Sequence, residues 1–335
     1  MSSKISVILP VRNAEGTLLT AIESCLQQRW ENFELLLVLN GCEDGSLEIA
    51  EAARVRDKRV QILNSPSEQG VAGAMQLGVE FAKCEIIARM DADDIARPTR
   101  FEKQLNFLNE HPEVDVVSSQ VRLLDSLGAG MSRYVDWVNG METPESVARE
   151  RFIECPVIQP SLMMRREAVI EAGGYCVRSW AEDHDLFLRM LEQGVQFGKV
   201  PEVLLEWRDS ENRLTRSHPA YAEEEVWKMK AHYLARLPMV QSEGVVICGA
   251  GPIGKRLGKL LTVLGVSVHG FFEVHPRRIG TEIAGCPVVG SGELGSRWRG
   301  AVLLSAVGVE GGRERVRELV QSAEYQEGRD FFATC

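Results

Sequence analysis

Two apolar spacings alternate along the first half of the chain. Short, nearly continuous apolar runs at 5–9, 33–39, 60–63 and 86–88 are typical of buried strands in a parallel sheet. Between these runs, apolar residues recur every three or four positions, as in amphipathic helices. The helical spacings are Leu18, Ile22 and Leu26; Val71, Met75 and Val79; and Phe101, Leu105 and Leu108. Strands that alternate with helices predict a doubly wound α/β fold, with a mixed, mostly parallel sheet flanked by helices.

The alternation restarts near residue 244, which predicts a second domain. An apolar run at 245–248 leads through a glycine-rich turn into another helical spacing. A chain of 335 residues is long enough for two domains. We therefore expect a first domain over 1–236, with a last helix at 221–236 that packs across it. A linker at 237–243 and a small α/β domain over 244–335 follow.

An acidic turn follows the fourth apolar run. Asp91, Asp93 and Asp94 lie between that run and a helix predicted to begin near Pro98. In open α/β sheets, ligands bind at the carboxyl ends of the strands. Carboxylates this close repel one another, and Mg²⁺ binds one or two carboxylates together with phosphate oxygens and water. The cluster predicts a site for a metal-bound diphosphate, although one aspartate could simply cap the following helix.

The composition excludes several other functions. A formal net charge of −10 argues against a general nucleic-acid binder. No apolar run reaches the length of a transmembrane helix, and the first residues lack the pattern of a secretory signal. The eight cysteines are scattered singly, as is typical of a reducing cytoplasm. We expect a cytoplasmic protein that can lie at the inner membrane face to reach its acceptor.

Taken together, the motifs resemble glycosyltransferase family 2 over about residues 4 to 210. Any one motif would be weak, but their joint order along the chain is specific. The motifs are residues 7–13, the turn after Val38, Gly70, residues 88–95 with Pro98, Arg100 and Gln104, and then 111–117, 160–163, 173–175 and 181–183. The resemblance implies the A-type glycosyltransferase (GT-A) fold, a single nucleotide-binding α/β domain.

Carried over position by position, the resemblance implies a donor site. The implied donor-binding residues are Pro10, Val11, Arg12, Asn13, Asn40, Gly70, Asp91 and Ala92. Among them, Asp91 is implied to bond the ribose, while Asp93 coordinates Mn²⁺ or Mg²⁺ on the diphosphate with Asp91 beside it. A divalent cation would stabilise the charge that builds up on the nucleoside diphosphate as the sugar bond breaks.

Two positions depart from the family pattern. Asn40 stands where the family usually has an aspartate that reads the base, and Arg12 stands where it often has an aromatic residue. An asparagine can both donate and accept, and a guanidinium can stack on a base or pair with a phosphate. UDP-sugar is the default donor, and Asn40 could alternatively be an ordinary turn residue.

The acids at 182–185 carry the predicted catalytic base. The resemblance implies that Asp183 takes the proton of an acceptor hydroxyl in a direct displacement with inversion. Glu182 could orient the acceptor. Because the helix dipole favours acids in a first turn, it could by itself explain Glu182, Asp183 and Asp185.

A polar segment at 207–218 is predicted to lie beside the donor. Arg213, Arg216 or His218 could close over the diphosphate. His218 could also complete the metal shell, although a single surface histidine more often has no such role.

The glycine-rich turn of the second domain matches a dinucleotide-binding fingerprint. Gly249, Gly251 and Gly254 follow a predicted strand and open a helix, and Glu273 ends the next strand, where a ribose-binding acid would lie. The domain looks like the small Rossmann-like domains attached to some sugar-modifying enzymes. It could bind a nucleotide or anion, with an NAD-type nucleotide as one candidate, or be structural or dimerising.

The leading interpretation is a metal-dependent, inverting glycosyltransferase of bacterial glycan or surface polysaccharide synthesis. Its partners would be a nucleotide-sugar donor and a glycan, lipid-linked or small-molecule acceptor. One alternative is a nicotinamide-dependent sugar-nucleotide oxidoreductase centred on 249–254. Another is a non-catalytic nucleotide-sugar-binding protein, and the chain could form a homodimer.

Overall fold

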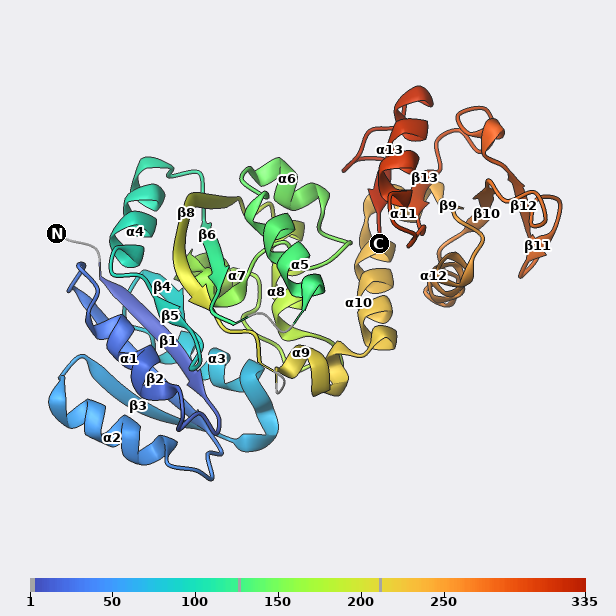
Figure 1. The fold of residues 1–335 in the computed structure, drawn as a ribbon. Helices are drawn as coiled ribbons and strands as arrows, with labels where there is room; N and C mark the ends of the chain where they lie inside the picture. The colour runs from blue at the N-terminus through green and yellow to red at the C-terminus, as the bar shows by residue number, and fades with distance from the viewer. Residues whose placement is uncertain (1–3, 126–127, 211–212) are drawn as a thin grey trace. The chain divides into compact units, whose positions relative to one another are not determined.

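The computed structural model describes residues 4–125, 128–210 and 213–335. These residues form two compact units (Figure 1). The first unit contains residues 1–147 and 156–217, and the second contains 148–155 and 218–335. Each unit is built around its own sheet.

The sheet of the first unit is mixed and mostly parallel at one end. Its strands are β1 (Ile5–Val11), β2 (Phe33–Asn40), β3 (Val60–Ser65), β4 (Ile86–Arg89), β5 (Ile95–Ala96), β6 (Val116–Leu123), β7 (Met163–Arg165) and β8 (Phe197–Trp207). They lie in the order β3-β2-β1-β4-β7-β6-β8-β5. The first four are parallel, β7 is antiparallel to both β4 and β6, β8 is parallel to β6, and β5 is antiparallel to β8.

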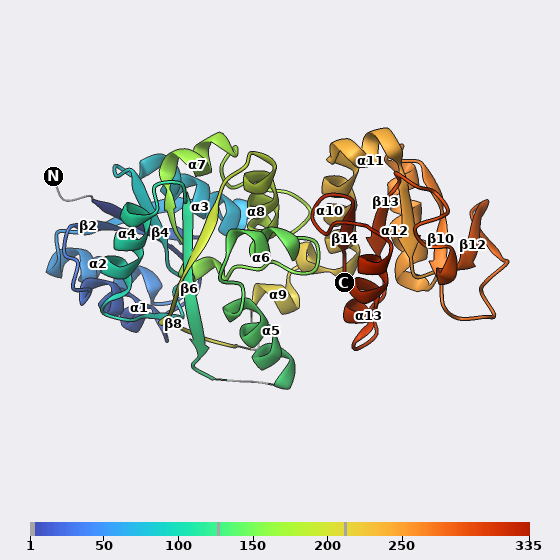
Figure 2. The ribbon, with the colours of Figure 1, turned by 90° about the horizontal axis from the view of Figure 1, so that it is seen from above.

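Helices cover both faces of this sheet (Figure 2). The helices between residues 18 and 217 are α1 (Leu18–Leu26), α2 (Ser46–Arg56), α3 (Gly70–Phe81), α4 (Arg100–Glu110), α5 (Ala129–Asn139), α6 (Pro144–Arg149), α7 (Arg166–Glu171), α8 (Glu182–Glu192) and α9 (Leu214–Ser217). Short 3₁₀ turns are η1 (Ser67–Gln69) and η2 (Gln159–Ser161). The predicted doubly wound α/β fold is therefore confirmed.

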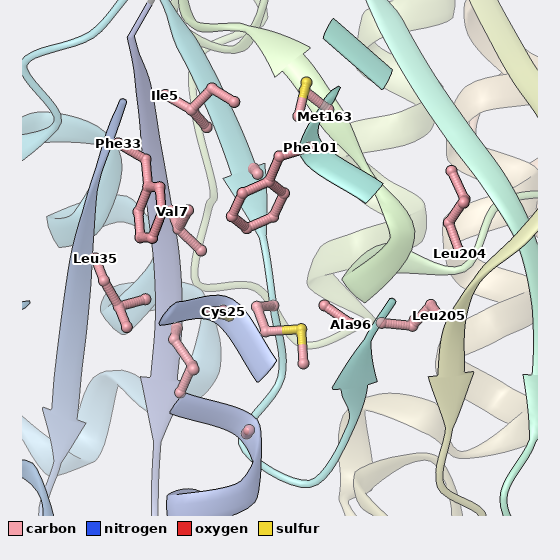
Figure 3. Close-up of a cluster of buried hydrophobic side chains, with 14 of the residues drawn as sticks. Ile5, Val7, Cys25, Phe33, Leu35, Ala96, Phe101, Met163, Leu204 and Leu205 are labelled. Carbon is pink, nitrogen blue, oxygen red and sulfur yellow. The ribbon is translucent and has the colours of Figure 1, made fainter. Parts of the chain in front are cut away.

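The alternation of side chains along β1 explains the two layers. Ile5, Val7 and Leu9 pack in one core cluster with Phe101 of α4 (Figure 3). Ile8 points to the opposite face, where α3 approaches so closely that a Cβ on its Gly78 would lie 2.3 Å from Ile8 Cγ2. A strand with both faces covered must be apolar at nearly every position, which is the pattern of residues 5–9.

The second unit contains a smaller, mainly parallel sheet. Its elements are η3 (Pro219–Tyr221), α10 (Glu223–Arg236), α11 (Pro238–Glu243), β9 (Val245–Cys248), α12 (Pro252–Val263), β10 (Val268–Glu273), β11 (Glu282–Ile283), β12 (Cys286–Gly290), η4 (Ser291–Glu293), β13 (Val302–Ser305), α13 (Gly312–Ser322) and β14 (Phe331–Ala333). The strand order is β11-β12-β10-β9-β13-β14, with only the short β11 antiparallel to its neighbour among the described strands.

Segment 148–155 packs within the second unit, although it lies in the middle of the expected first domain. Glu150 is 2% exposed and forms an ion pair with Arg317 of α13 at 2.7 Å. Phe152 packs edge-to-face on Phe332 of β14, with 5.8 Å between ring centroids. A buried carboxylate is costly unless it is paired with a cation, and burying an aromatic ring stabilises the fold through the hydrophobic effect. Both contacts therefore hold the segment in the second unit.

Helix α10 also belongs to the second unit, whereas the sequence analysis placed it at the end of the first domain. It contacts α12. Its buried Lys230 donates from Nζ to the carbonyls of Ile153 at 2.7 Å and Thr334 at 2.9 Å. Because these partners come from distant parts of the chain, local composition could not locate the boundary between 217 and 218.

Candidate active site

The carboxyl ends of β2, β1 and β4 meet at one edge of the first sheet. These strands are adjacent and parallel, and the register pairs Ile8 with Arg89 and Val11 with Leu39. The loops that follow them therefore start side by side. This edge gathers the predicted donor-binding loop at 10–13, Asn40 and the acidic turn at 91–94.

Reciprocal hydrogen bonds join the loop after β1 to the loop after β2. The amide of Glu15 donates to Asp44 Oδ2 at 2.9 Å, and the amide of Gly45 donates to Glu15 Oε2 at 2.8 Å. Asn13, at a φ of +49°, accepts from the amide of Glu43 at 2.8 Å through Oδ1. The two loops thus form one continuous surface.

The predicted donor-binding residues of the first loop differ in what they offer to a ligand. Arg12 and Asn13 are exposed, so their side chains can reach a nucleotide. Pro10 is half-buried. The side chain of Val11 is 1% exposed and lies in the core cluster, which leaves only its backbone for a ligand.

Asn40 is buried at the end of β2, and its orientation is fixed. Its Nδ2 donates to the carbonyl of Pro66 at 2.7 Å. The next residue, Gly41, has a φ of +62°, and a Cβ there would lie 2.5 Å from Ser67 Cβ. Gly70, at a φ of +58°, begins α3 after this turn. With its Nδ2 donating to Pro66, Asn40 can still accept a hydrogen bond through Oδ1.

The acidic turn after β4 divides into residues with different partners. Asp91 accepts from Arg89 Nε at 3.0 Å. Asp94 is 1% exposed and accepts from the amide of Arg208 at 2.8 Å, while Arg208 Nε donates to the carbonyl of Asp93 at 3.0 Å. Asp94 therefore ties the turn to the end of β8. Ala92, between them, is largely buried.

The carboxylate of Asp93 lies in a strongly acidic environment. Burial, and then the charge of Asp91, raise its pKa, against the opposing effect of Arg213 and Arg208. Burial and the neighbouring aspartates also raise the pKa of Asp94 well above its ordinary value. A cation placed between these groups would lower the cost of ionising them.

A divalent cation on a diphosphate fits this turn. Among the described residues, no group of three or more His, Cys, Asp or Glu side chains is arranged to hold a metal ion. A diphosphate-bound Mg²⁺ needs only one or two protein carboxylates, because phosphate oxygens and water supply the rest. Asp91 and Asp93 can provide these carboxylates, and the buried Oδ2 of Asp94 has no hydrogen-bond partner among the described residues.

Two acids in the first turn of α8 lie in different environments. Asp185 is fully buried and accepts from Trp180 Nε1 at 2.7 Å and from Arg189 Nε at 2.9 Å, with Arg178 Nε at 3.2 Å. Its partners make it a structural acid. Asp183 accepts from the amide of His184 at 2.7 Å through Oδ1.

The surroundings of Asp183 shift its pKa. Burial raises the pKa of Asp183, Arg89 acts in the opposite direction, and Asp91 adds to the rise. The geometric link between this helix and the acidic turn is Arg89, which pairs with Asp91 at 3.0 Å and lies 4.0 Å from Glu182. A helix N-terminus alone would have lowered this pKa, so the environment makes Asp183 a stronger base than its position in the helix indicates.

The polar segment after β8 contains a local charge network. Buried Asp209 faces Arg216 Nη2 at 2.7 Å and Arg213 Nη1 at 3.8 Å. The Arg213 guanidinium stacks over Trp207, 3.9 Å from the ring centroid. His218 is exposed, belongs to the second unit, and accepts from the amide of Ala220 at 3.3 Å through Nδ1.

The glycine turn of the second unit is shaped by close backbone packing. Gly249 has a φ of +110°, and a Cβ there would lie 2.8 Å from the carbonyl oxygen of Ala306. A Cβ on Gly254 would lie 1.9 Å from the carbonyl oxygen of Gly249, while Gly251 has no contact that close. Two of the three glycines are therefore required by the turn itself.

Glu273 is held by several groups at the end of β10. Its carboxylate accepts from the amides of Ala250 at 3.2 Å, Val274 at 2.8 Å and His275 at 3.1 Å, and from Arg278 Nη1 at 2.9 Å. Although burial opposes ionisation, these bonds lower its pKa. A carboxylate offers about four acceptor positions, so these donors already account for them.

Sequence reasoning missed Arg89, Gln159 and Arg208. Arg89 is 5% exposed and bonds Gln159 Oε1 at 3.3 Å as well as Asp91. The signal for Arg89 was present, because an arginine at the end of an apolar strand beside three acids needs a buried partner. Gln159 and Arg208 carried no such signal, since their partners are distant in sequence.

Comparison with known proteins agrees with this fold. The sequence profile of glycosyl transferase family 2 matches residues 6–173, and the chain belongs to this family. It is 29% identical over 227 residues to the O-antigen biosynthesis glycosyltransferase WbnJ of Escherichia coli, a match that covers 65% of this chain and 85% of WbnJ.

Two solved structures share the fold. The S. aureus TarS 1–349 complex with UDP-GlcNAc has a TM-score of 0.58 and 17% identity, and covers 77% of this chain and 71% of that one. A longer TarS structure is matched over 40% of its length. The mannosyltransferase PcManGT of Pyrobaculum calidifontis, solved with GDP-Man and Mn²⁺, has a TM-score of 0.52 and 16% identity, and covers 79% and 69%.

Within 4–125, 128–210 and 213–335, no helix combines the length and the apolar character needed to cross a bilayer.

Proposed function

We propose that the chain is a metal-dependent, inverting glycosyltransferase that moves a sugar from a UDP-sugar to an acceptor hydroxyl in bacterial glycan or surface polysaccharide synthesis. The observation that carries the proposal is that one buried arginine, Arg89, pairs with Asp91 of the acidic turn at 3.0 Å and lies 4.0 Å from Glu182, next to Asp183 on the first turn of α8. The likeness to WbnJ, an O-antigen biosynthesis glycosyltransferase, supports the polysaccharide context, and the TarS complex with UDP-GlcNAc supports the nucleotide-sugar donor. The Mn²⁺ complex of PcManGT supports the cation.

In the proposed reaction, Asp183 is the base. Its Oδ1 accepts the amide of His184, so Oδ2 is the atom that takes the proton of the acceptor hydroxyl. The acceptor oxygen attacks the anomeric carbon from the side opposite the diphosphate. Because burial raises the pKa of Asp183, its affinity for this proton is higher than that of an exposed aspartate.

The donor side neutralises the leaving group. Asp91 and Asp93 would hold a divalent cation, which as a Lewis acid stabilises the charge that develops on the nucleoside diphosphate. Arg12 is exposed and would meet the base or a phosphate. Asn40 would accept the N3–H of uracil through Oδ1, because its Nδ2 is held by Pro66.

A thermal-shift panel of UDP, GDP, CDP and dTDP, each with and without Mn²⁺, tests the donor side. We expect UDP with Mn²⁺ to raise the melting temperature most, since a ligand that binds only the folded state stabilises it. Asp93→Ala should remove the effect of Mn²⁺. The chain would instead be a non-catalytic binding protein if it bound UDP but released no UDP from any UDP-sugar when assayed with a broad set of acceptors.

For the second unit, we propose that Glu273 shapes the glycine turn and does not bind a ribose. Its four donors support this role, because a ribose hydroxyl would have to displace one of them. An NAD-dependent reaction remains a separate hypothesis. It predicts a change in nicotinamide absorbance, and family membership favours glycosyl transfer instead.

A further inference from the structure

Arg89 joins three segments that are far apart in the sequence. It lies at the end of β4 and is 5% exposed. Its Nε donates to Asp91 Oδ1 at 3.0 Å, and its Nη1 donates to Gln159 Oε1 at 3.3 Å. The same Nη1 lies 4.0 Å from Glu182 Oε1, on the first turn of α8. One guanidinium thus contacts the acidic turn, η2 and the helix that carries Asp183.

The chemistry of this contact requires an arginine. A buried cation is costly unless acids and hydrogen bonds surround it. Although burial opposes its charge, Asp91, Tyr175 and Glu182 raise the pKa of Arg89 well above its ordinary value, so it stays a cation. A planar fork with five donors can meet acids on two segments at once, which a single ammonium group cannot do in the same geometry.

A second buried arginine in the same region serves as a contrast. Arg100 is fully buried and donates to the backbone carbonyls of Arg89 at 2.8 Å and Leu162 at 3.3 Å, and to Gln104 Oε1 at 3.0 Å. Burial lowers the pKa of Arg100 to about 10. Arg100 therefore supports the backbone behind the turn, whereas Arg89 contacts the acids themselves.

We propose that Arg89 is a positioning residue that fixes the carboxylate of Asp91 and the first turn of α8 relative to each other, and so sets the distance between the donor and the base. This inference rests on the proposed function. Arg89 acts through Asp91 and Glu182 and touches no reacting atom. Its loss should therefore slow the chemical step more than it weakens donor binding.

The test compares Arg89→Met and Arg89→Lys with the wild type and with Arg166→Met as a matched control. Arg166 is a half-buried arginine whose Nε donates to the carbonyl of Val79, away from the acids. UDP release from UDP-GlcNAc with Mn²⁺ gives kcat and the donor KM. Hydrogen–deuterium exchange of residues 182–186 without ligand reports the order of the first turn of α8.

We expect R89M to lower kcat by about 10- to 100-fold, the range for a lost charged hydrogen bond, with the donor KM within about threefold. Exchange at 182–186 should accelerate in R89M and stay at the wild-type rate in R166M. R89K keeps the charge and should recover part of kcat. In the double variant R89M/E182Q, kcat should lie within about threefold of R89M, because coupled residues do not act additively.

Two results would overturn the inference. One is unchanged exchange at 182–186 in R89M, and the other is accelerated exchange with an unchanged kcat. A wild-type chain that neither binds UDP nor releases it would contradict the proposed function instead. The exchange measurement needs no ligand, so it still decides whether Arg89 holds the helix in place.

Discussion

Asp183 and Asp185 lie two residues apart on α8, and their substitution by asparagine should have opposite effects. Asp185 is fully buried and contacts Arg189 Nε at 2.9 Å, Arg178 Nε at 3.2 Å and Trp180 Nε1 at 2.7 Å. The D185N substitution removes the negative charge that pairs with Arg178 and Arg189. Removing one partner of a buried ion pair costs about 3–5 kcal/mol.

That loss can be converted into a melting temperature. For a unit of roughly 200 residues, each kcal/mol shifts the melting temperature by about 2–4 °C, so D185N should melt about 6–20 °C lower than the wild type. D183N should melt at the wild-type temperature or above, because burial raises the pKa of Asp183 and its charge therefore destabilises the fold. Its turnover should fall by about 10²–10⁴-fold, the range for a lost general base.

The pH dependence of stability follows from the same shift. The pKa of Asp183 is raised in the folded chain above its ordinary value of 3.8, so the folded state binds a proton that the unfolded state has released. Stability should therefore fall as the pH rises from about 4 to the folded pKa, and D183N should lack this contribution.

Differential scanning fluorimetry from pH 4 to 8, with UDP release as the activity assay, measures both effects. A D183N protein that melts as low as D185N would refute the assignment of separate roles. So would a D183N protein with wild-type turnover.

Three further predictions concern packing, metal and the second unit. Gly78→Ala should destabilise by about 1–3 kcal/mol through overpacking against Ile8; Gly16→Ala, where a Cβ meets nothing within 4 Å, is the control in urea denaturation. Removal of divalent metal with EDTA should abolish UDP release and Mn²⁺ should restore it; Asp93→Asn should need more Mn²⁺ for half-maximal rate, and an unchanged requirement would contradict a role in metal binding. Hydrogen bonds lower the pKa of Glu273, although burial opposes them, so its stabilising contribution should be lost as the pH falls below its ordinary value of 4.5. In Glu273→Gln, the melting temperature should fall less steeply below pH 4.5 than in the wild type. An unchanged pH dependence would refute the proposal that Glu273 shapes the glycine turn.

The parallel half of the first sheet could be predicted because its pattern is local. The runs at 5–9, 33–39, 60–63 and 86–88 lie within β1, β2, β3 and β4, and three of the four are followed by a helical spacing. The far half could not be predicted in the same way. Strand β5 has two residues, and it pairs with β8 more than one hundred positions later. Such pairings depend on tertiary contacts that no periodicity records.

The candidate site was predictable where chemistry is concentrated in sequence. Three acids in one turn after a strand repel one another, and a bound cation can reduce this repulsion. The roles of Asp185 and Asp94 were not readable, because they depend on partners at Trp180 and Arg208. The same is true of Asn40, whose orientation comes from a backbone carbonyl on another strand's loop.

The path of segment 148–155 has a consequence for how this protein is made and engineered. Glu150 and Arg317 are separated by 167 positions, so the segment leaves the ribosome long before its packing partners exist. Its final packing can form only after most of the chain has been synthesised. A shortened gene that stops near position 236, or a chimaera that replaces only the later part, would leave the ring of Phe152 and the acid of Glu150 without the neighbours that bury them. A design that transfers the second unit to another protein must therefore include both 148–155 and 218–335.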